Sequence, residues 1–327
     1  MSLCTHYDAM LFDLDGTVWE GTTALPHAVS VLNALDAHIF YITNNASRSA
    51  QEVTKLLNEC GIMARTDQVL TAAQAAVNLA TQHLQAGDTV LVLGADSFRD
   101  LVHEAGYRVV DSADDNPKAV VQGHSPETGW KELSEAALAI RRGAKYFVSN
   151  LDASLPSPRG LMVGNGSMVA AVVSATGQQP ISAGKPEPTL FHQAAQKCAA
   201  RRPLVIGDRL DTDIAGGVAA HMDTLHVLTG VSQSYELIHA KSSQRPTYIA
   251  QDLRALHEDR DRLTPQEQGG FIVRRDARDI ILSGGSEQSH SIEALRSVVA
   301  YAWQDEQFEG NIIAESPRAQ QILEEWA

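Results

Sequence analysis

The chain has 327 residues, of which 44% are hydrophobic, and a formal net charge of −14. A chain of this length suits two or three globular domains. The acidic balance argues against nucleic acid or an anionic membrane surface as a partner, because both require a basic footprint. No apolar run approaches the roughly 20 residues that span a bilayer, so we expect a soluble protein without membrane contact.

Three cysteines occur, at Cys4, Cys60 and Cys198, far apart in the sequence and odd in number. Such a set favours buried, reduced thiols over a disulfide or a zinc site. The twelve histidines form no His-Glu-x-x-His pattern, so none is expected to bind a metal. These features favour a reducing, cytoplasmic environment.

Strand and helix patterns alternate over the first 85 residues. They predict strands at 10–12 and 38–42 and helices at 26–35, 47–60 and 67–84. Ser47 is the expected N-cap of the second helix, and Gly61 its stop. Strand, helix and strand in succession imply a right-handed parallel crossover.

The same alternation restarts at Thr89 and ends near Ile181. It predicts strands at 90–94, 107–110, 119–121 and 145–148 and helices at 97–105 and 130–142. Gly164-Asn165-Gly166 is expected to form a turn. A unit of about a hundred residues suits a domain of its own, so we predict an inserted α/β domain at 86–182.

The first pattern then resumes, with helices predicted at 187–200 and 214–220 and strands at 203–206, 224–228 and 248–249. One domain interrupted by another is the simplest layout. We therefore predict an α/β fold in which residues 1–85 and 183–256 form a doubly wound core around a parallel sheet.

The composition changes after about residue 256. Residues 257–327 contain 14 acidic and 7 basic residues, a balance of −7 that accounts for half of the net charge of the chain. Their patterns predict a strand pair at 271–273 and 280–282 and helices at 291–303 and 317–326. We expect a small α+β extension that serves in packing or in forming a homodimer.

Two aspartates separated by one residue end the first strand, in the stretch Asp13-Leu14-Asp15-Gly16-Thr17. Carboxylates at this spacing do not both ionise cheaply unless a cation or strong donors lie between them. Mg²⁺ meets that need, because it takes oxygen ligands and retains waters and a substrate phosphate in its shell. Taken alone, the stretch is also compatible with a strand followed by an ordinary Asp-Gly turn.

Three further polar segments lie at the end of a predicted strand or just before a helix: Thr43-Asn44-Asn45, Gly184-Lys185-Pro186, and Gly207-Asp208 with Asp213. Each alone is compatible with a plain turn or a solvated loop. In an open parallel sheet, ligands gather outside the carboxyl ends of the strands, so the segments are expected to share one pocket. A phosphate there would depend on local positive groups, because the chain as a whole is acidic.

In this order, the four segments resemble the four motifs of the haloacid dehalogenase (HAD) superfamily. About 140 residues separate Thr43 from Lys185 but only about thirty separate Asp15 from Thr43, so the insertion follows the second motif. This layout resembles the type-two-capped HAD phosphatases, which include the NagD-like and p-nitrophenyl phosphatase-like enzymes. The resemblance covers residues 8–256 and leaves the extension outside.

The resemblance implies a phosphatase that works through an aspartyl-phosphate. Asp13 would be the nucleophile, and Asp15 would protonate the leaving alkoxide and then activate water. Asp13, Asp15 through its main-chain carbonyl, and Asp208 would hold Mg²⁺. The dehalogenases of the superfamily lack the second aspartate, so Asp15 favours phosphate-ester hydrolysis over halide displacement.

The same resemblance assigns the phosphate-binding groups. Thr43, the amide of Asn44 and Lys185 would bind the phosphoryl oxygens, where a cation offsets the charge of the transferring group. Asp213 and Asn45 would contact the ligands rather than the phosphate, and would orient them.

Specificity is expected in the loops of the inserted cap, because a cap excludes water and contacts the leaving group. The candidate loops are 123–125 and 150–159, with His124, Asn150 and Asp152 as the candidate residues. Many relatives carry Gly-Leu-Asp where this chain has Gly-His-Ser, so the cap chemistry differs from theirs.

The Gly207–Asp213 motif, combined with an extra C-terminal segment, resembles the glycerol-3-phosphate phosphatases. A small phosphorylated metabolite is therefore the expected partner, with nucleotides, sugar phosphates and pyridoxal phosphate as alternatives to glycerol 3-phosphate. A phosphotransferase is a second possibility. A non-enzymatic regulatory protein is a third, but such a protein would be expected to have lost Asp13, Asp15 or Lys185, and all three are present.

Overall fold

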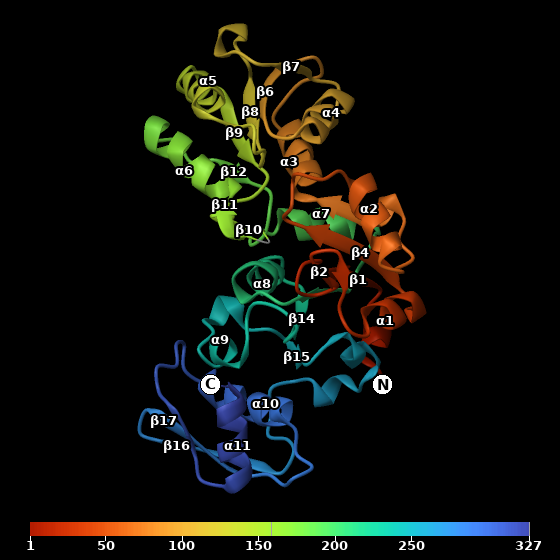
Figure 1. The fold of residues 1–327 in the computed structure, drawn as a ribbon, viewed down its shortest axis with the longest axis vertical. Helices are drawn as coiled ribbons and strands as arrows, with labels where there is room; N and C mark the ends of the chain where they lie inside the picture. The colour runs from red at the N-terminus through yellow and green to blue at the C-terminus, as the bar shows by residue number, and fades with distance from the viewer. Residues whose placement is uncertain (158, 327) are drawn as a thin grey trace. The chain divides into compact units, whose positions relative to one another are not determined.

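The computed structural model describes residues 1–157 and 159–326, and these form two compact α/β units, which confirms the predicted fold class. The first unit comprises residues 1–40, 59–63 and those from 195 onward, and the second comprises 41–58 and 64–194. Figure 1 traces the chain through both units. Pro158, in the predicted specificity loop, and Ala327, at the end of the predicted extension, lie outside the described residues. The domain boundaries inferred from the sequence remain predictions.

A parallel sheet forms the centre of the first unit. Its strands lie in the order β15, β14, β13, β1. Their bounds are Ala9–Phe12 for β1, Pro203–Gly207 for β13, Asp223–Val227 for β14 and Tyr248–Ala250 for β15. All four residues of β1 are buried, as expected for a strand covered on both faces. Because Phe12 pairs with Ile206, β1 and β13 end side by side.

Short elements surround this sheet. The hairpin strands β2 (Trp19–Glu20) and β3 (Thr23–Ala24) and the helix α9 (Ser234–Ile238) were not predicted from the sequence. The other helices of this part are α1 (Ala28–Ala34), a π-helical turn at Leu210–Ile214, and α8 (Ala215–Ala219). Single 3₁₀ turns in the described chain are Leu3–His6, Thr66–Gln68, Ala113–Asp115, Ser242–Gln244, Leu253–His257 and Arg260–Arg262.

The C-terminal extension has the predicted α+β composition. Strands β16 (Phe271–Asp276) and β17 (Asp279–Gly284) pair in antiparallel fashion, as predicted. An unpredicted strand, β18 (Ile312–Ala314), adds to β17 in parallel. Helices α10 (Ser291–Ala302) and α11 (Pro317–Trp326) pack on this small sheet (Figure 1).

The extension shares its hydrophobic core with the rest of the first unit. Buried side chains from around α8, α9 and β15 join those of the extension in one cluster, which includes Leu210, Ile214, Leu237, Ile238, Ile249, Val273, Leu282, Leu295, Val298 and Ile322. Arg296 is also buried, and its Nε donates to the main-chain oxygen of Ile249 at 2.8 Å. Burial lowers the pKa of Arg296 to about 10. The extension is therefore an integral part of this unit.

Arg245 is a second polar anchor for the extension. Its guanidinium donates to four main-chain oxygens, those of Ala240, Trp303, Asp305 and Glu306. The same group lies over the ring of Trp303, 5.8 Å from the ring centroid. One side chain thus fixes the loop that follows α10.

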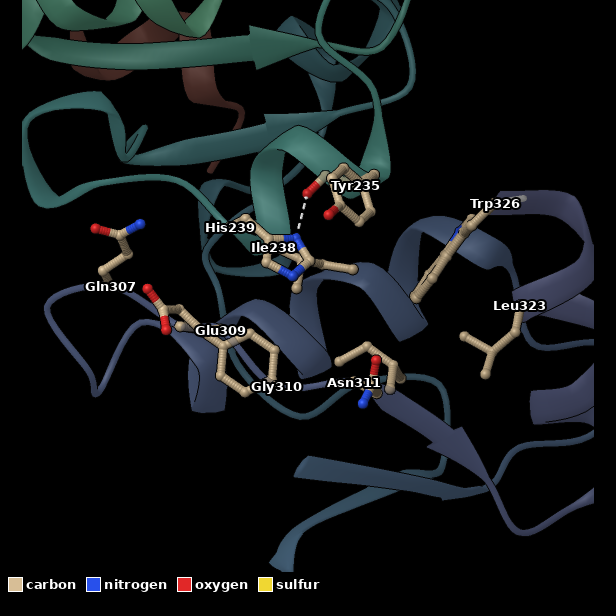
Figure 2. Close-up of a pocket in the computed structure, with 11 residues that line it drawn as sticks. Tyr235, Ile238, His239, Gln307, Glu309, Gly310, Asn311, Leu323 and Trp326 are labelled. Atoms are coloured by element: carbon tan, nitrogen blue, oxygen red, sulfur yellow. Dashed lines mark hydrogen bonds between the residues drawn. The ribbon is translucent and has the colours of Figure 1, made fainter. Parts of the chain in front are cut away.

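A pocket of about 580 Å³ lies where α9 meets the extension (Figure 2). The ring of His239 stacks on that of Tyr235, with centroids 4.3 Å apart, and lies 5.6 Å from that of Phe308. Trp326 and Leu323 of α11 line the same pocket. Aromatic packing between α9 and the extension therefore continues from the core to the surface.

The second unit contains a five-stranded parallel sheet in the order β12, β9, β8, β6, β7. Helices α5 and α6 pack on one face and α3 and α4 lie along the other (Figure 1). The strands are β6 (Thr89–Leu93), β7 (Arg108–Val110), β8 (Ala119–Gln122), β9 (Lys145–Val148) and β12 (Ile181–Ser182). The helices are α3 (Ala72–Thr81), α4 (Asp96–Glu104), α5 (Trp130–Arg141) and α6 (Asn165–Thr176).

The second unit also contains helices and strands outside that five-stranded sheet. Strand β4 (His38–Thr43), whose last three residues belong here, pairs in parallel with β5 (Val69–Thr71). Helices α2 (Ala50–Glu59) and α7 (Thr189–Lys197) each extend past the boundary of the unit. Strands β10 (Ser154–Ser157) and β11 (Gly160–Val163) form an unpredicted antiparallel hairpin.

Three local predictions are wrong. Ser47 does not cap α2, because its hydroxyl donates to the side chain of Asn45, and Ser49 forms the capping box with Glu52 instead. The helix predicted at 67–84 begins only at Ala72, since the three residues before it pair with β4.

The third error concerns Gly164, which is the N-cap of α6 rather than part of a free turn. A Cβ at Gly164 would lie 2.3 Å from the main-chain oxygen of Asp152, so the glycine permits close approach of two loops. The three cysteines are each partly exposed rather than buried, contrary to the prediction from the sequence. In residues 1–157 and 159–326, no helix combines the length and apolarity needed to cross a membrane.

Candidate active site

Three carboxylates meet at the carboxyl ends of β1 and β13. Asp13, Asp208 and Asp213 each place one oxygen within 4.8 Å of the other two. Asp13 directly follows β1, and its N–H donates to the oxygen of Ile206 in β13 at 2.8 Å. Asp208 directly follows β13, and Asp213 lies in the π-helical turn after it. The parallel pairing of two strands thus brings together residues about 200 positions apart.

Asp208 is held by donors at both carboxylate oxygens. The side chain is fully buried. The Thr17 hydroxyl donates to Oδ1 at 3.1 Å, and the N–H of Val231 donates to Oδ2 at 2.7 Å. A Cβ at Gly16 or Gly230 would lie 2.5 or 2.0 Å from Oδ2, so both positions require glycine. The orientation of this carboxylate is therefore tightly fixed.

Asp213 is similarly enclosed. Only 1% of the side chain is exposed, and Oδ2 accepts a hydrogen bond from the N–H of Arg209 at 3.1 Å. A Cβ at Gly207 would lie 2.3 Å from the Cβ of Asp213. Asp13, by contrast, is partly exposed. Asp13 is therefore the partly exposed carboxylate of the group, and the other two carboxylates are buried.

The side chain of Asp15 lies outside this group of three and is exposed. The indole Nε1 of Trp19 donates to its Oδ1 at 3.0 Å, and the N–H of Gly16 donates to the oxygen of Trp19 at 2.8 Å. The turn that follows β1 thus fixes Asp15 while leaving it accessible, as a group that exchanges protons with solvent requires.

The three carboxylates fit a Mg²⁺ ion. They supply only oxygen ligands, which Mg²⁺ prefers at about 2.0–2.1 Å, and opposite ligands in such a shell lie about 4.2 Å apart. Oxygens within 4.8 Å of one another match that size. Two of the three carboxylates are buried, and buried like charges at this distance require a compensating cation.

The second unit holds the predicted phosphate-binding residues. Thr43 ends β4 and is buried, and its Oγ1 accepts from the N–H of Asn45 at 3.0 Å. The Asn45 side chain in turn accepts from the N–H and the hydroxyl of Ser47. These local bonds form a tight polar turn directly after the strand.

Asn44 and Lys185 are joined by two hydrogen bonds. The N–H of Lys185 donates to Oδ1 of Asn44 at 2.8 Å, and Nδ2 of Asn44 donates to the oxygen of Lys185 at 3.1 Å. Lys185 is 3% exposed. The structure thus brings together the second and third predicted motifs.

Two of the three predicted cap residues lie at this junction. Nδ2 of Asn44 also donates to the Asp152 carboxylate at 3.2 Å, and Asn150 Nδ2 donates to the oxygen of Asn44 at 2.7 Å. His124 follows β8 and is partly buried, and its Nδ1 has no hydrogen-bond partner among the described residues. The 150–152 segment therefore contacts the turn at 43–45 directly.

Comparison with protein families matches residues 10–108 to the haloacid dehalogenase-like hydrolases and residues 182–256 to a HAD-hydrolase-like family. The chain is also 46% identical to a D-glycerol 3-phosphate phosphatase of Mycobacterium tuberculosis, over 83% of this chain and 77% of that protein. The chain belongs to the haloacid dehalogenase-like hydrolase family. The predicted superfamily and hydrolase class are confirmed.

Other relatives of this chain are also phosphatases. An acid sugar phosphatase of Staphylococcus haemolyticus is 37% identical over 76% of this chain and 94% of that protein. A crystal structure of glycerol phosphate phosphatase from Mycobacterium tuberculosis with magnesium covers 100% of this chain and 99% of its own, with a TM-score of 0.95 and 41% identity. A 4-nitrophenylphosphatase from Thermotoga maritima covers 79% of this chain and 99% of its own, with a TM-score of 0.73 and 26% identity.

In this HAD family member, one loop near the carboxylates was missed by sequence reasoning. The segment Thr229-Gly230-Val231-Ser232 follows β14 and surrounds Asp208. The Thr229 hydroxyl donates to the oxygen of Gly16 at 2.6 Å, which ties this loop to the turn after β1. The signal was a Thr-Gly pair at the end of a parallel strand, where ligand-binding loops are expected.

Proposed function

We propose that this protein is a Mg²⁺-dependent phosphatase that hydrolyses a small phosphate monoester through an aspartyl-phosphate, with D-glycerol 3-phosphate as the first candidate substrate. The observation that carries the proposal is the convergence of Asp13, Asp208 and Asp213 at two neighbouring strand ends. The 46% identity to a D-glycerol 3-phosphate phosphatase supports the substrate.

Asp13 is the proposed nucleophile. It is the partly exposed member of the group, so its carboxylate is accessible to a substrate. A carboxylate oxygen of Asp13 attacks phosphorus, the new P–O bond forms, and the bond to the leaving alkoxide breaks in line.

Asp15 is the proposed general acid and base. It gives its proton to the leaving alkoxide in the first step. In the second step it takes a proton from water, which attacks phosphorus, releases inorganic phosphate and restores the Asp13 carboxylate. Its exposed position and the Trp19 hydrogen bond suit a group that must be both oriented and able to exchange protons.

Asp13, Asp208 and the main-chain carbonyl of Asp15 are the proposed Mg²⁺ ligands, and Asp213 lies close enough to bind the ion or its waters. When bound, Mg²⁺ neutralises charge on the phosphoryl oxygens. The orientation of Asp208 is fixed before an ion binds, because both of its carboxylate oxygens accept hydrogen bonds.

Thr43, the amide of Asn44 and Lys185 are the proposed phosphate ligands, with Asn45 supporting the turn. A lysine ammonium and backbone donors stabilise the charge that the phosphoryl group carries during transfer. They also provide the local positive potential that an acidic protein needs in order to bind an anion.

The leaving group is proposed to contact the cap residues Asn150 and Asp152, and His124 is the third candidate. The Asp152 carboxylate accepts from Asn44 and is partly exposed, so it is able to accept hydrogen bonds from substrate hydroxyls. Such an acceptor favours a polyol or sugar phosphate over a substrate with an apolar leaving group.

A panel of phosphate esters tests this proposal. Phosphate release would be measured for D-glycerol 3-phosphate, a hexose phosphate, a nucleoside monophosphate and pyridoxal phosphate, with and without Mg²⁺. We expect the highest kcat/KM for D-glycerol 3-phosphate and no turnover without the metal. A hexose phosphate in first place would favour the activity of the acid sugar phosphatases instead.

Product analysis distinguishes hydrolysis from phosphoryl transfer. In the presence of an added alcohol, a hydrolase releases inorganic phosphate, whereas a phosphotransferase forms a new ester. A regulatory protein without enzymatic activity would release no phosphate from any ester under either condition.

The extension has a proposed packing role, which the shared hydrophobic core supports. Contact between two copies through this region, giving a homodimer, is a separate prediction that a mass measurement in solution tests. The odd number and wide spacing of the three cysteines in the sequence favour a reducing, cytoplasmic location.

A further inference from the structure

A buried histidine lies behind the loop that encloses Asp208. His226 is in the central strand β14 and is fully buried. Its Nε2 lies 2.9 Å from the main-chain oxygen of Ser232. A carbonyl oxygen only accepts hydrogen bonds, so Nε2 carries the proton and donates it.

The Ser232 main chain transmits this contact to Asp208. The N–H of Ser232 donates to the main-chain oxygen of Asp208 at 3.1 Å, and the preceding residue, Val231, donates to the Asp208 carboxylate. The Ser232 hydroxyl accepts from the N–H of Leu210 at 3.1 Å. His226 therefore holds Ser232 in place. Ser232 binds the main chain of Asp208, and the adjacent Val231 binds its side chain.

The burial of His226 is energetically costly. Its Nδ1 has no hydrogen-bond partner among the described residues. Burying a polar atom without a partner is unfavourable, and an aliphatic residue in the same strand would avoid this cost. The neighbours of His226 in β14, Leu225 and Val227, are apolar and buried. A polar residue here needs a reason beyond core packing.

We infer that His226 is a positioning residue for the metal site, which acts through Ser232 and Val231 on Asp208. This inference rests on the proposed function, because it takes Asp208 as a Mg²⁺ ligand. The Nε2–H group holds the loop at 229–232 against the end of β13, so that the N–H of Val231 donates to Asp208 Oδ2 and keeps the orientation in which this carboxylate would bind the ion. Removing a residue that orients a metal ligand typically weakens metal binding by about 10- to 100-fold.

Isothermal titration calorimetry of Mg²⁺ binding to the metal-free protein tests this inference without any turnover. His226→Leu removes the donor while keeping a buried side chain of similar size, and we expect its Kd for Mg²⁺ to rise at least about tenfold. His226→Gln keeps an N–H donor at a similar reach, and we expect its affinity to stay close to that of wild type. Circular dichroism establishes that each variant is folded.

Thr224→Val is the matched control. Thr224 is a buried residue of the same strand, and its hydroxyl accepts from the N–H of Thr247 at 3.1 Å, away from Asp208. The variant loses one buried hydrogen bond but should bind Mg²⁺ like wild type. If His226→Leu fails to fold, His226→Phe replaces it, because it also removes the Nε2–H donor while keeping a buried ring at this position.

The outcomes separate this inference from the proposed function. Asp208→Asn should abolish Mg²⁺ binding, and an unchanged Kd in that variant would overturn the metal site itself. If Asp208→Asn abolishes binding while folded His226→Leu or His226→Phe retains wild-type affinity, only the positioning role is refuted. Equal weakening in the Leu and Gln variants would also refute it, because the donor would then be irrelevant.

Discussion

Asn44 and Lys185, 141 residues apart in sequence, hold each other through a reciprocal pair of hydrogen bonds. The Asn44 side-chain amide accepts from the N–H of Lys185 and donates to its C=O, as a neighbouring strand would. The backbone from which the lysine extends is therefore fixed to the turn after β4. The position of the Lys185 ammonium depends on a residue that the sequence analysis had assigned only to phosphate binding.

Replacing Asn44 by alanine should impair catalysis through this link. The variant loses both bonds to Lys185, and a displacement of a phosphate-binding group by about 1 Å costs roughly 100-fold in rate. We expect kcat/KM for the best ester of the panel to fall by about that factor. Steady-state kinetics would measure it.

Asn78→Ala is the control for Asn44→Ala. Asn78 also donates one side-chain hydrogen bond in the second unit, to Gln193, but at the surface. Its variant should keep wild-type kcat/KM. Wild-type kinetics in folded Asn44→Ala would show that Lys185 does not depend on this pair.

Gly230→Ala should damage the site without removing any functional side chain. The new Cβ would lie 2.0 Å from Asp208 Oδ2, so either the loop or the carboxylate must move. We expect Mg²⁺-dependent activity to fall roughly 10- to 100-fold. Gly129→Ala, where the nearest atom to the new Cβ lies 3.5 Å away, should remain fully active. An active Gly230→Ala enzyme would mean that Asp208 need not keep its observed orientation.

His226 should make stability depend on pH. Burial lowers the pKa of His226 from 6.5 to about 4, so the unfolded chain binds more protons than the folded chain between these values. Stability from this residue is complete above about pH 6.5, decreases as the pH falls, and is lost by about pH 4. The difference amounts to about 3 kcal/mol.

Urea denaturation of wild type and His226→Gln at several pH values measures this contribution. Other groups titrate in both proteins, so the informative quantity is the difference between the two free energies of unfolding. Relative to His226→Gln, wild type should lose about 3 kcal/mol of its free energy of unfolding as the pH falls from 6.5 to 4. A constant difference would contradict the assignment of a neutral, buried His226.

Arg245→Met should loosen the extension. Four hydrogen bonds to main-chain oxygens are lost, and we expect the free energy of unfolding to fall by about 2–4 kcal/mol. Kinetic constants at a temperature where the protein is folded should be unchanged, because Arg245 contacts none of the proposed catalytic residues. Arg278→Met, at a side chain that is 81% exposed, should change stability by less than about 0.5 kcal/mol. Equal losses in both variants would contradict the anchoring role.

The sequence predicted the parts of the site that depend on motif order and strand ends. Asp13 and Asp208 follow short apolar runs typical of buried parallel strands, and the order of the four motifs predicted their convergence. The paired strands and two helices of the extension were also predictable from their periodicity.

Contacts made by backbone groups were not predictable in this way. The loop around Asp208 acts through the N–H of Val231, and any residue type carries an N–H group. His226 appeared as one polar residue in an apolar strand, and only the structure shows that it faces the oxygen of Ser232. Ser47 and Ser49 are equally good caps by composition, and competition from Asn45 decided between them.

The central claim is that Asp13 becomes phosphorylated, and trapping that species tests it most directly. Asp15→Asn lacks the proposed base for the attacking water, and p-nitrophenyl phosphate needs no acid to release its leaving group, so the intermediate should accumulate in the presence of Mg²⁺. Borohydride reduction followed by peptide mass spectrometry should then find homoserine at position 13. An unmodified Asp13 during a measurable burst of p-nitrophenol, or a modification at another carboxylate, would contradict the mechanism.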